Sequence, residues 1–450
     1  DGGSYLVDIL PGVGACITRT VAIVPKYNNG TWQSYYRQFL TALGARYGNH
    51  PQIVAFVFGP GIDEEYGTQT KDFFECNTKA NPYQSDASYM DAIVRASIVG
   101  DLLDTARQAF PNKPVMLQFT GSGKDRADIA MQKGYSFPIG LKQATLTYDN
   151  NNQWQNNNVG TIQIMQRYSQ TTYIAWENAY AYTGPPPQGI QIRYFTLLAG
   201  LMSFPSYMDF IGGWMFDWDL NDWGILHFVQ SHLGRTITDT QDIWVALRDT
   251  DYYPPSGGGA LTYGGWHDDF TFALHRIGPE AGVNNPTIKR AAMAAAPYNV
   301  PTTTQAHIYS FIARRTDNAS GNNTMSFYAD PRWGYYNQPT VAQNPATGAW
   351  FDVILRYLDI GTDTLSLSYM SSQGMTRTQT INKTNTRNWI TTTVVLNDLV
   401  FAHRLARGAD LILNSDPQNG GLDEIVHMVQ VVGTGVARRR PPRRGAQRLC

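Results

Sequence analysis

Residues 173–182 read YIAWENAYAY: an apolar and aromatic run ends at Trp176, and Glu177 and Asn178 follow at once. The run has the length of a buried β-strand and is one of six such runs between residues 21 and 216. The six are VAIVP (21–25), IVAFVFG (53–59), PVMLQFT (114–120), GLKQATL (140–146), TYIAW (172–176) and MDFIGGWMF (208–216). Segments with apolar residues at helical spacing separate them. This alternation predicts a parallel sheet covered by helices, because parallel neighbours need long crossover connections.

Two closures are common for such a sheet: a (β/α)8 TIM-like barrel and an open, doubly wound sheet. No GxGxxG motif opens a helix, which counts against a dinucleotide-binding open sheet. We therefore expect a TIM-like barrel over residues 1–238, with MDFIGGWMF as the eighth strand, TYIAW as the seventh and IVAFVFG as the fourth. Residues 1–20 offer one more candidate strand, YLVDIL, and cannot hold two βα units. Either the N-terminal part of the barrel is missing or the barrel is irregular.

The pattern changes near residue 240. From there, short segments of alternating apolar and polar residues are broken by Gly, Asn, Pro and Asp, without helical patterns between them. Strands at this spacing predict an antiparallel β-sandwich, which we place at residues 239–436 as an accessory domain. Residues 437–450 are rich in Arg and Pro and have no apolar period, so we expect a disordered tail. A basic anchoring tail is the alternative.

The composition describes a weakly charged, aromatic-rich protein. Charged residues make up 16% of the 450 residues, aromatic residues 12%, and the net charge is −1. This balance gives no electrostatic footprint for nucleic acid or an anionic membrane. No apolar run is long enough to predict a membrane span. A surface rich in Asn, Thr, Gln, Tyr and Trp suits a neutral, hydroxyl-rich partner such as a sugar, although any secreted protein of low charge shares it.

Several features predict an extracellular protein. The chain begins at Asp1 without a signal peptide, as expected of a mature or truncated product. Its Asn-X-Ser/Thr sequons lie at Asn29, Asn318, Asn322 and Asn382. The three cysteines, Cys16, Cys76 and Cys450, allow one disulfide, Cys16 to Cys76, and show no zinc-binding spacing.

Glutamate is scarce, and its positions point to a site. The chain has six glutamates: Glu64, Glu65, Glu75, Glu177, Glu280 and Glu424. Three of them, Glu64, Glu65 and Glu177, come just after two of the predicted parallel strands. In a βα barrel, the loops at these strand ends build the active site. The simpler alternatives are a buried ion-pair partner for Glu177, an exposed acidic turn or a cation site for Glu64 and Glu65, and surface turns for Glu280 and Glu424.

Two carboxylates on different barrel strands suit glycoside hydrolysis. One carboxyl group protonates the leaving oxygen, while the other attacks the anomeric carbon or activates a water molecule. A separation of roughly 5–5.5 Å implies retention of configuration, and about 6.5–9.5 Å implies inversion. Adjacent Glu64 and Glu65, near Asp63, would supply the like-charge repulsion that keeps an acid protonated.

A glutamate after strand four and another after strand seven resemble the large clan of retaining barrel glycosidases, which includes many cellulases, xylanases, mannanases and β-galactosidases. Residues 1–235 carry the likeness. The resemblance implies that Glu177 is the nucleophile and that Glu65 or Glu64 is the acid/base. Glu65 is favoured, because a glutamate followed by an aromatic residue and glycine, as in EYG, is common there. The clan usually has Asn before the acid/base, whereas this chain has Glu64 or Asp63.

Aromatic residues gather after the last predicted barrel strand, in GGWMFDWDLNDWG (212–224), where flat rings suit the apolar faces of sugars. The resemblance implies that the ring of Trp214 forms the floor of the sugar subsite. Trp218 is a further candidate to bind the sugar. Asp217 and Asp219 are candidates to bind hydroxyl groups. Core packing is the alternative for the tryptophans. The other candidate lining residues are Trp32, Tyr66, Gln118, Lys142, Tyr148, Trp176 and Asn178, and the resemblance implies that Tyr148 lies near the nucleophile.

The sequence therefore predicts a retaining glycoside hydrolase that acts on a β-linked oligo- or polysaccharide. It predicts no organic cofactor and no catalytic metal, because GWHDDF (265–270) reads as a turn or a structural calcium site and no HExxH motif occurs. The alternatives are a non-catalytic carbohydrate-binding or cell-surface protein on a degenerate barrel, and a transglycosylase that uses the same two glutamates. The sugar, the linkage and the oligomeric state are left open.

Overall fold

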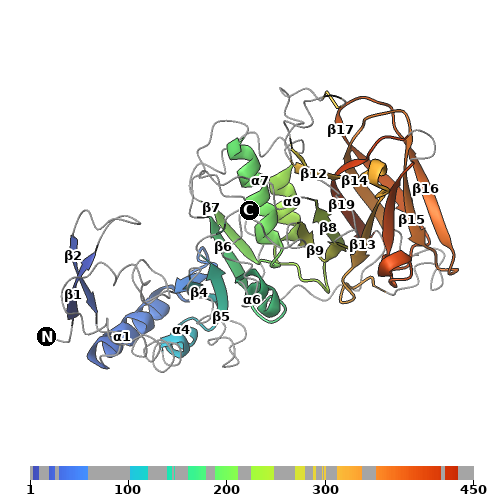
Figure 1. The fold of residues 1–450 in the computed structure, drawn as a ribbon. Coiled ribbons are helices and arrows are strands. Elements are labelled where there is room, and N and C mark those ends of the chain that lie inside the picture. Colours follow the sequence, from blue (N-terminus) through green and yellow to red (C-terminus); the bar gives the residue numbers. More distant parts are fainter. Residues whose placement is uncertain are drawn as a thin grey trace. The chain divides into compact units, whose positions relative to one another are not determined.

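The computed structural model describes residues 4–9, 20–25, 30–58, 102–119, 139–143, 146, 161–178, 188–210, 224–247, 269–278, 287–289, 296, 298–299, 312–336, 351–416 and 421–433 (Figure 1). They fall into two compact units. Unit 1 takes in the described residues up to 178 together with residues 203–210. Unit 2 takes in residues 188–202 and the described residues from 224 onward.

A five-stranded parallel sheet organises unit 1. Its strands run in the order β3 (Phe56–Phe58), β4 (Val115–Phe119), β5 (Ile139–Gln143), β6 (Ile174–Asn178) and β7 (Tyr207–Phe210). Every neighbouring pair is parallel, and every strand lies beside the next one in the chain. These are the strands predicted as four to eight, so their parallel pairing is confirmed. The sheet has the order of a half-barrel, and a closed eight-stranded barrel stays a prediction.

The first predicted parallel strand was assigned wrongly. VAIVP lies in β2 (Thr20–Pro25), which pairs antiparallel with β1 (Ser4–Ile9) in a separate two-stranded sheet. Residues 10–19 between the two strands are too few for the helical crossover that parallel pairing requires, so a hairpin arrangement is favoured. YLVDIL, the other N-terminal candidate, is confirmed as a strand.

Helices pack against one face of the parallel sheet. The ring of Phe56 contacts the tilted ring of Phe110, which follows α4 (Leu103–Ala109), with ring centroids 3.7 Å apart. The ring of Phe58 contacts that of Tyr36 in α1 (Gly30–Tyr47), with ring centroids 5.9 Å apart. A further helix, α6 (Thr161–Tyr168), precedes β6. None of the helices among the described residues combines the length and apolar character that a bilayer crossing requires.

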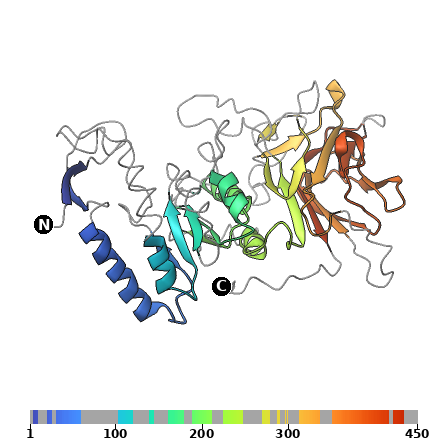
Figure 2. The same ribbon diagram turned by 90° about the horizontal axis from the view of Figure 1, so that it is seen from below.

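Unit 2 contains two antiparallel sheets and the helices α7 (Gln188–Leu201) and α9 (Ile225–His232) (Figure 2). The larger sheet comprises β8 (Asp242–Ala246), β9 (Phe270–Phe272), β11 (Thr287–Lys289), β12 (Ile312–Arg315), β14 (Phe351–Leu358), β17 (Trp389–Leu396) and β19 (Ile425–Gly433). The smaller sheet comprises β10 (Leu274–Arg276), β13 (Thr324–Ala329), β15 (Thr364–Met370), β16 (Thr376–Asn382) and β18 (Leu411–Ser415). The antiparallel pairing is confirmed, and sandwich packing stays a prediction.

Strand β19, the last of the described strands, is central in the larger sheet. It pairs with β14 along one side and with β12 and β8 along the other. The strand has nine residues, and the first seven, Ile425 to Val431, are all buried. By contrast, β15 alternates between buried and half-buried residues, as expected for a strand with one face toward the core.

Two of the sequons are part of the fold. The Asn318 amide donates to the carbonyl oxygens of Gly421 and Leu422, at 3.1 and 3.2 Å, and Asn322 is only 8% exposed. A glycan on Asn318 would displace these contacts, and a glycan on Asn322 would require this buried side chain to become exposed, so neither sequon supports export. Asn382, at the end of β16, is exposed. Asn29 lies outside the described residues.

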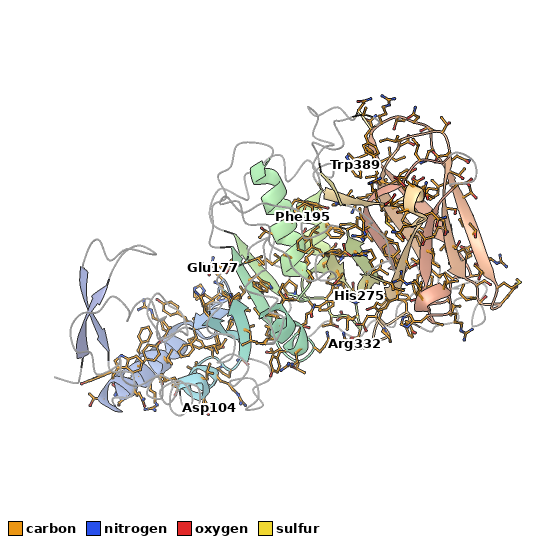
Figure 3. All side chains as sticks on the ribbon, viewed as in Figure 1. Asp104, Glu177, Phe195, His275, Arg332 and Trp389 are labelled. Carbon is orange, nitrogen blue, oxygen red and sulfur yellow. The ribbon has the colours of Figure 1, made fainter. Side chains whose placement is uncertain are left out.

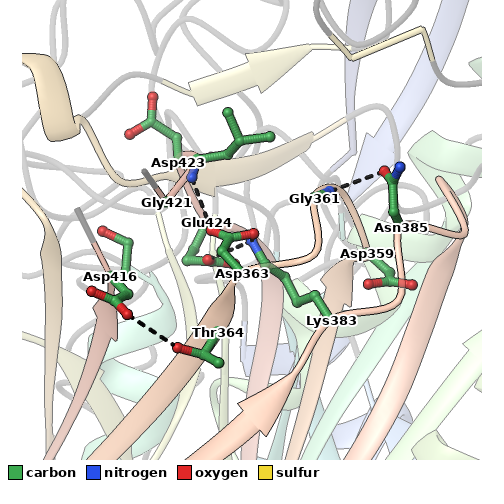
Figure 4. Close-up of polar contacts among 12 residues, drawn as sticks. Asp359, Gly361, Asp363, Thr364, Lys383, Asn385, Asp416, Gly421, Asp423 and Glu424 are labelled. Carbon is green, nitrogen blue, oxygen red and sulfur yellow. Dashed lines mark hydrogen bonds and ion pairs between the residues drawn. The ribbon is translucent and has the colours of Figure 1, made fainter. Parts of the chain in front are cut away.

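A buried lysine links two acidic residues in unit 2 (Figure 4). Nζ of Lys383 lies 2.6 Å from Oε1 of Glu424 and 2.8 Å from Oδ1 of Asp363, and the three side chains are 1%, 1% and 8% exposed. Oε2 of Glu424 is buried without a hydrogen-bond partner. The prediction of Glu424 as a surface turn residue was therefore wrong. Burial raises the pKa of Glu424 to about 8, although the charge of Lys383 opposes this shift.

The raised pKa of Glu424 predicts that the protein loses stability as the pH rises. The folded pKa of about 8 lies above the usual value of 4.5, so the folded state binds the extra proton between these values. The free energy of unfolding should fall by a few kcal/mol at most between about pH 5 and about pH 8. Urea unfolding of wild type and Glu424→Gln across this range measures the effect. Equal slopes for the two proteins would contradict the prediction.

Candidate active site

Three charged side chains meet at the carboxyl end of the parallel sheet. Nζ of Lys142, on β5, lies 2.6 Å from Oε2 of Glu177 on β6 and 2.9 Å from Oδ2 of Asp209 on β7. Figure 3 shows Glu177 at this end of the sheet. The side chains of Lys142, Glu177 and Asp209 are 8%, 28% and 58% exposed, so the ammonium is buried beneath two more accessible carboxylates.

The register of the strands brings these residues together. Glu177 is aligned directly with Asp209, whereas Lys142 is aligned with Ala175, two residues earlier on β6. Residues two apart on a strand point to the same face, so all three charged side chains share one face of the sheet. Below them, that face carries an apolar cluster of Met116, Tyr173, Ala175 and Tyr207.

Gln118 occupies the same face on β4. It is aligned directly with Lys142 and is 6% exposed. The predicted lining residue Gln118 and the predicted nucleophile Glu177 therefore lie on the same face, with β5 between their strands. This face carries an amide, an ammonium and two carboxylates on four neighbouring strands.

The two carboxylates keep Lys142 charged. Burial alone would lower the pKa of Lys142 and is the largest single influence, but the hydrogen bonds and charges of Glu177 and Asp209 together raise it. A lysine that attacks a carbonyl group must lose its proton, which requires a lowered pKa. The arrangement therefore favours a fixed cation over an amine nucleophile. Burial, with a smaller contribution from Tyr173, raises the pKa of neighbouring Tyr207 to about 12, so this phenol is neutral at physiological pH.

Of three further predicted lining residues, the structure contradicts one, Trp176, and the roles of Trp32 and Asn178 stay predictions. Trp176 is fully buried, and its indole donates to Oγ of Ser203 at 2.6 Å. Trp176 shares a face of the sheet with Ile174, two residues earlier on β6. The residues aligned with Ile174 on the neighbouring strands are Leu141, Leu117 and Phe58, and Phe58 lies on the helix-covered face. The prediction that Trp176 lines a sugar site was therefore wrong. Trp32 stacks on Tyr36 within α1, with ring centroids 5.1 Å apart. The Asn178 backbone pairs with Phe210 on β7.

Many of the predicted site residues lie outside the described part of the chain. They are Glu64, Glu65, Tyr66, Tyr148, Trp214, Asp217, Trp218 and Asp219. The distance from Glu177 to either candidate acid/base therefore stays a prediction. Within GWHDDF, Asp269 is described and pairs with Arg276 at 2.7 Å. The described residues hold no group of three or more side chains suited to bind a metal.

Sequence reasoning missed Asp209 and gave Lys142 only a minor place. Both are charged residues inside apolar runs, YMDF and GLKQ, that were expected to be covered on both faces. A buried charge requires a partner, so a lysine and two acids in consecutive strands were a usable signal. The register needed to pair them could not be read from the sequence.

No protein-family model matches the chain, and no curated protein matches it in sequence. Three solved structures show weak similarity. The arabinose-bound α-L-arabinofuranosidase MgGH51 has 12% identity and a TM-score of 0.23, with 44% of this chain and 27% of that chain covered. A Clostridium thermocellum endo-1,4-β-D-xylanase 10B, complexed with xylohexaose, has 14% identity and a TM-score of 0.17, with 29% and 23% covered.

The third structure, Bacteroides uniformis β-glucuronidase 2 covalently bound to cyclophellitol-6-carboxylate aziridine, has 8% identity and a TM-score of 0.28. It covers 91% of this chain and 57% of that one. The chain thus spans less than two thirds of the length of each of these three proteins. All three are glycoside hydrolases.

Proposed function

We propose that the protein is a carbohydrate-active enzyme, a glycoside hydrolase that cleaves β-glycosidic bonds of an oligo- or polysaccharide with retention of configuration. The observation that carries the proposal is the position of Glu177. Its carboxylate lies at the carboxyl end of a parallel strand, on a face with Asp209 and Gln118, and an ammonium lies 2.6 Å away. Carboxylates at this end of βα strands are typical of catalytic sites.

In the proposed reaction, a Glu177 oxygen attacks the anomeric carbon of the sugar. The bond from that carbon to the leaving oxygen breaks as Glu65 or Glu64 donates its proton to this oxygen. The same residue then removes a proton from water, and the water oxygen attacks the anomeric carbon and releases Glu177. Both acid/base candidates are carried over from the sequence, as is the role of Trp214 beneath the sugar.

The proposal includes the arrangement of the rest of the chain. The half-barrel sheet belongs to a closed barrel that forms the catalytic domain, and the two antiparallel sheets form an accessory sandwich. The enzyme acts outside the cell, which fits its low content of charged residues, 16% of the chain.

Covalent trapping tests the proposed nucleophile. A panel of 2-deoxy-2-fluoro-β-glycosyl fluorides is incubated with the full chain, because the fluorine slows the hydrolysis of a glycosyl-enzyme ester. Mass spectrometry of the digested protein should find the sugar on the peptide that contains Glu177. A label on another carboxylate, with turnover of the parent glycoside, would overturn the assignment. Sugar binding without turnover or labelling would favour the non-catalytic alternative, and transfer to an added acceptor would favour a transglycosylase.

A further inference from the structure

The backbone of Lys142 lies further from the carboxyl end of the sheet than the backbones of the two acidic residues that it contacts. Its backbone is aligned with Ala175, whereas Glu177 lies two residues nearer the carboxyl end. This offset corresponds to about 6–7 Å along the strand. Ala175 is small and buried, so no large side chain on β6 stands beside the lysine stem. The flexible four-carbon stem therefore carries the ammonium up to the level of the carboxylates.

Lys142 is also the only cation on the five described parallel strands. The titratable groups that share its face are Glu177, Asp209, Tyr173 and Tyr207, as the alternation along each strand requires. With the Tyr207 phenol neutral, one ammonium faces two carboxylates on these strands. These carboxylates are aligned on neighbouring strands, where like charges repel each other, so the ammonium between them removes much of that repulsion.

Two other uses of a buried lysine fit this geometry poorly. A nucleophilic amine requires a lowered pKa, and the two carboxylates raise the pKa of Lys142. A lysine that binds an anionic substrate must offer its charge to the ligand. Here both Glu177 and Asp209 already lie within 2.9 Å of the ammonium. The contacts suit a lysine that holds other side chains in place.

We propose that Lys142 is a positioning residue for Glu177: it binds Oε2 of Glu177 and Oδ2 of Asp209, and it leaves Oε1 of Glu177 as the oxygen that attacks the anomeric carbon. This inference rests on the proposed glycosidase function. Among the described residues, Lys142 is the group that contacts the Glu177 carboxylate, and the contact is to Oε2. A carboxylate held by one oxygen cannot rotate freely, so its second oxygen has a fixed direction of attack.

The test compares wild type with Lys142→Met, which removes the charge but keeps a long stem, and with Lys142→Arg, which keeps the charge. Lys113→Met is the control. Lys113 lies in the same unit, before the start of β4, and donates to the His50 carbonyl oxygen at 3.0 Å. Two readouts are taken on the full chain: kcat and KM across the pH range with a cleaved β-glycoside, and the titration of ¹³C-labelled glutamate carboxyl groups by NMR. With only six glutamates, the Glu177 signal can be assigned from its loss in Glu177→Gln.

Lys142→Met should lower kcat on the order of 10²-fold with little change in KM, because the attacking oxygen is misplaced. The acid limb of the pH–rate profile and the NMR titration of the Glu177 carboxyl group should both move to higher pH, because the positive charge beside the carboxylate is lost. Lys142→Arg should restore most of this shift, and Lys113→Met should behave as wild type. A purely structural lysine would lower the melting temperature and leave both pH midpoints in place.

An unchanged acid limb and an unchanged Glu177 signal in Lys142→Met would overturn the proposal, whatever the loss of activity. If wild type cleaves no glycoside, the proposed function fails, and with it the catalytic part of this inference. The carboxyl titration needs no substrate, so it still decides whether Lys142 controls the charge of Glu177. The two failures are therefore distinguishable.

Discussion

Replacing Glu177 with glutamine should lower kcat/KM for a β-glycoside by about 10³-fold or more, because an amide cannot form the glycosyl ester on which the second step depends. The fold should survive the change. The glutamine carbonyl oxygen can still accept a hydrogen bond from Lys142, and Asp209 remains 2.9 Å from the ammonium. Steady-state kinetics with a chromogenic substrate identified from a panel measures the effect, and thermal unfolding checks the fold.

Asp104→Asn provides the matched control for Glu177→Gln. Asp104 lies in the first turn of α4, in the same unit but on a helix, and the same carboxyl-to-amide change there should leave kcat/KM within about twofold. A shorter variant, Glu177→Ala, should recover turnover with added azide, which attacks the anomeric carbon in place of the missing carboxylate. Activity near the wild-type level in Glu177→Gln would exclude this residue as the nucleophile.

Replacing Lys383 with methionine should cost about 3–5 kcal/mol of unfolding free energy, because it removes one partner from a buried ionic group. Asp363 and Glu424 would remain buried without the ammonium that lies 2.8 and 2.6 Å from them. Urea or thermal unfolding of unit 2, followed by tryptophan fluorescence, measures the loss. A change below about 1 kcal/mol would show that the group is not stabilised by its lysine.

Two further variants separate charge from packing at Lys383. Above about pH 8, where Glu424 ionises, adding Glu424→Gln to Lys383→Met removes one of the uncompensated charges and should recover part of the lost stability. Arg332→Met breaks an ion pair with Asp330 in which the arginine side chain is 67% exposed, and it should change stability by less than about 1 kcal/mol. If the exposed and buried variants lost equal stability, burial would not explain the effect.

The parallel strands could be predicted because each is an apolar run of strand length, separated by helical patterns. The same reasoning placed VAIVP in the wrong sheet. A short apolar run has the same sequence pattern whether its strand joins a parallel sheet or an antiparallel pair. The error over Trp176 was avoidable. Trp176 and Glu177 are consecutive in a strand, so they must point to opposite faces, and both could not line one site.

The contacts of the candidate site could not be read from the sequence. Glu177 was found because glutamate is rare and this one follows a strand. Its pairing with Lys142 and Asp209 depends on a two-residue offset between β5 and β6, which no local pattern encodes. The Lys383 group was missed for the same reason, since its members lie 20 to 61 residues apart along the chain, at positions 363, 383 and 424.

The parallel sheet and the larger antiparallel sheet differ in the point of synthesis at which all their strands are available. In the parallel sheet, each strand lies beside its predecessor in the chain, so the strands can add in the order in which the ribosome releases them. The larger antiparallel sheet has to wait for β19, since β8, β12 and β14 all pair with this late segment. A ribosome that stalls before Ile425 would therefore present three strand edges without their common partner, and these are the edges that a chaperone would have to shield.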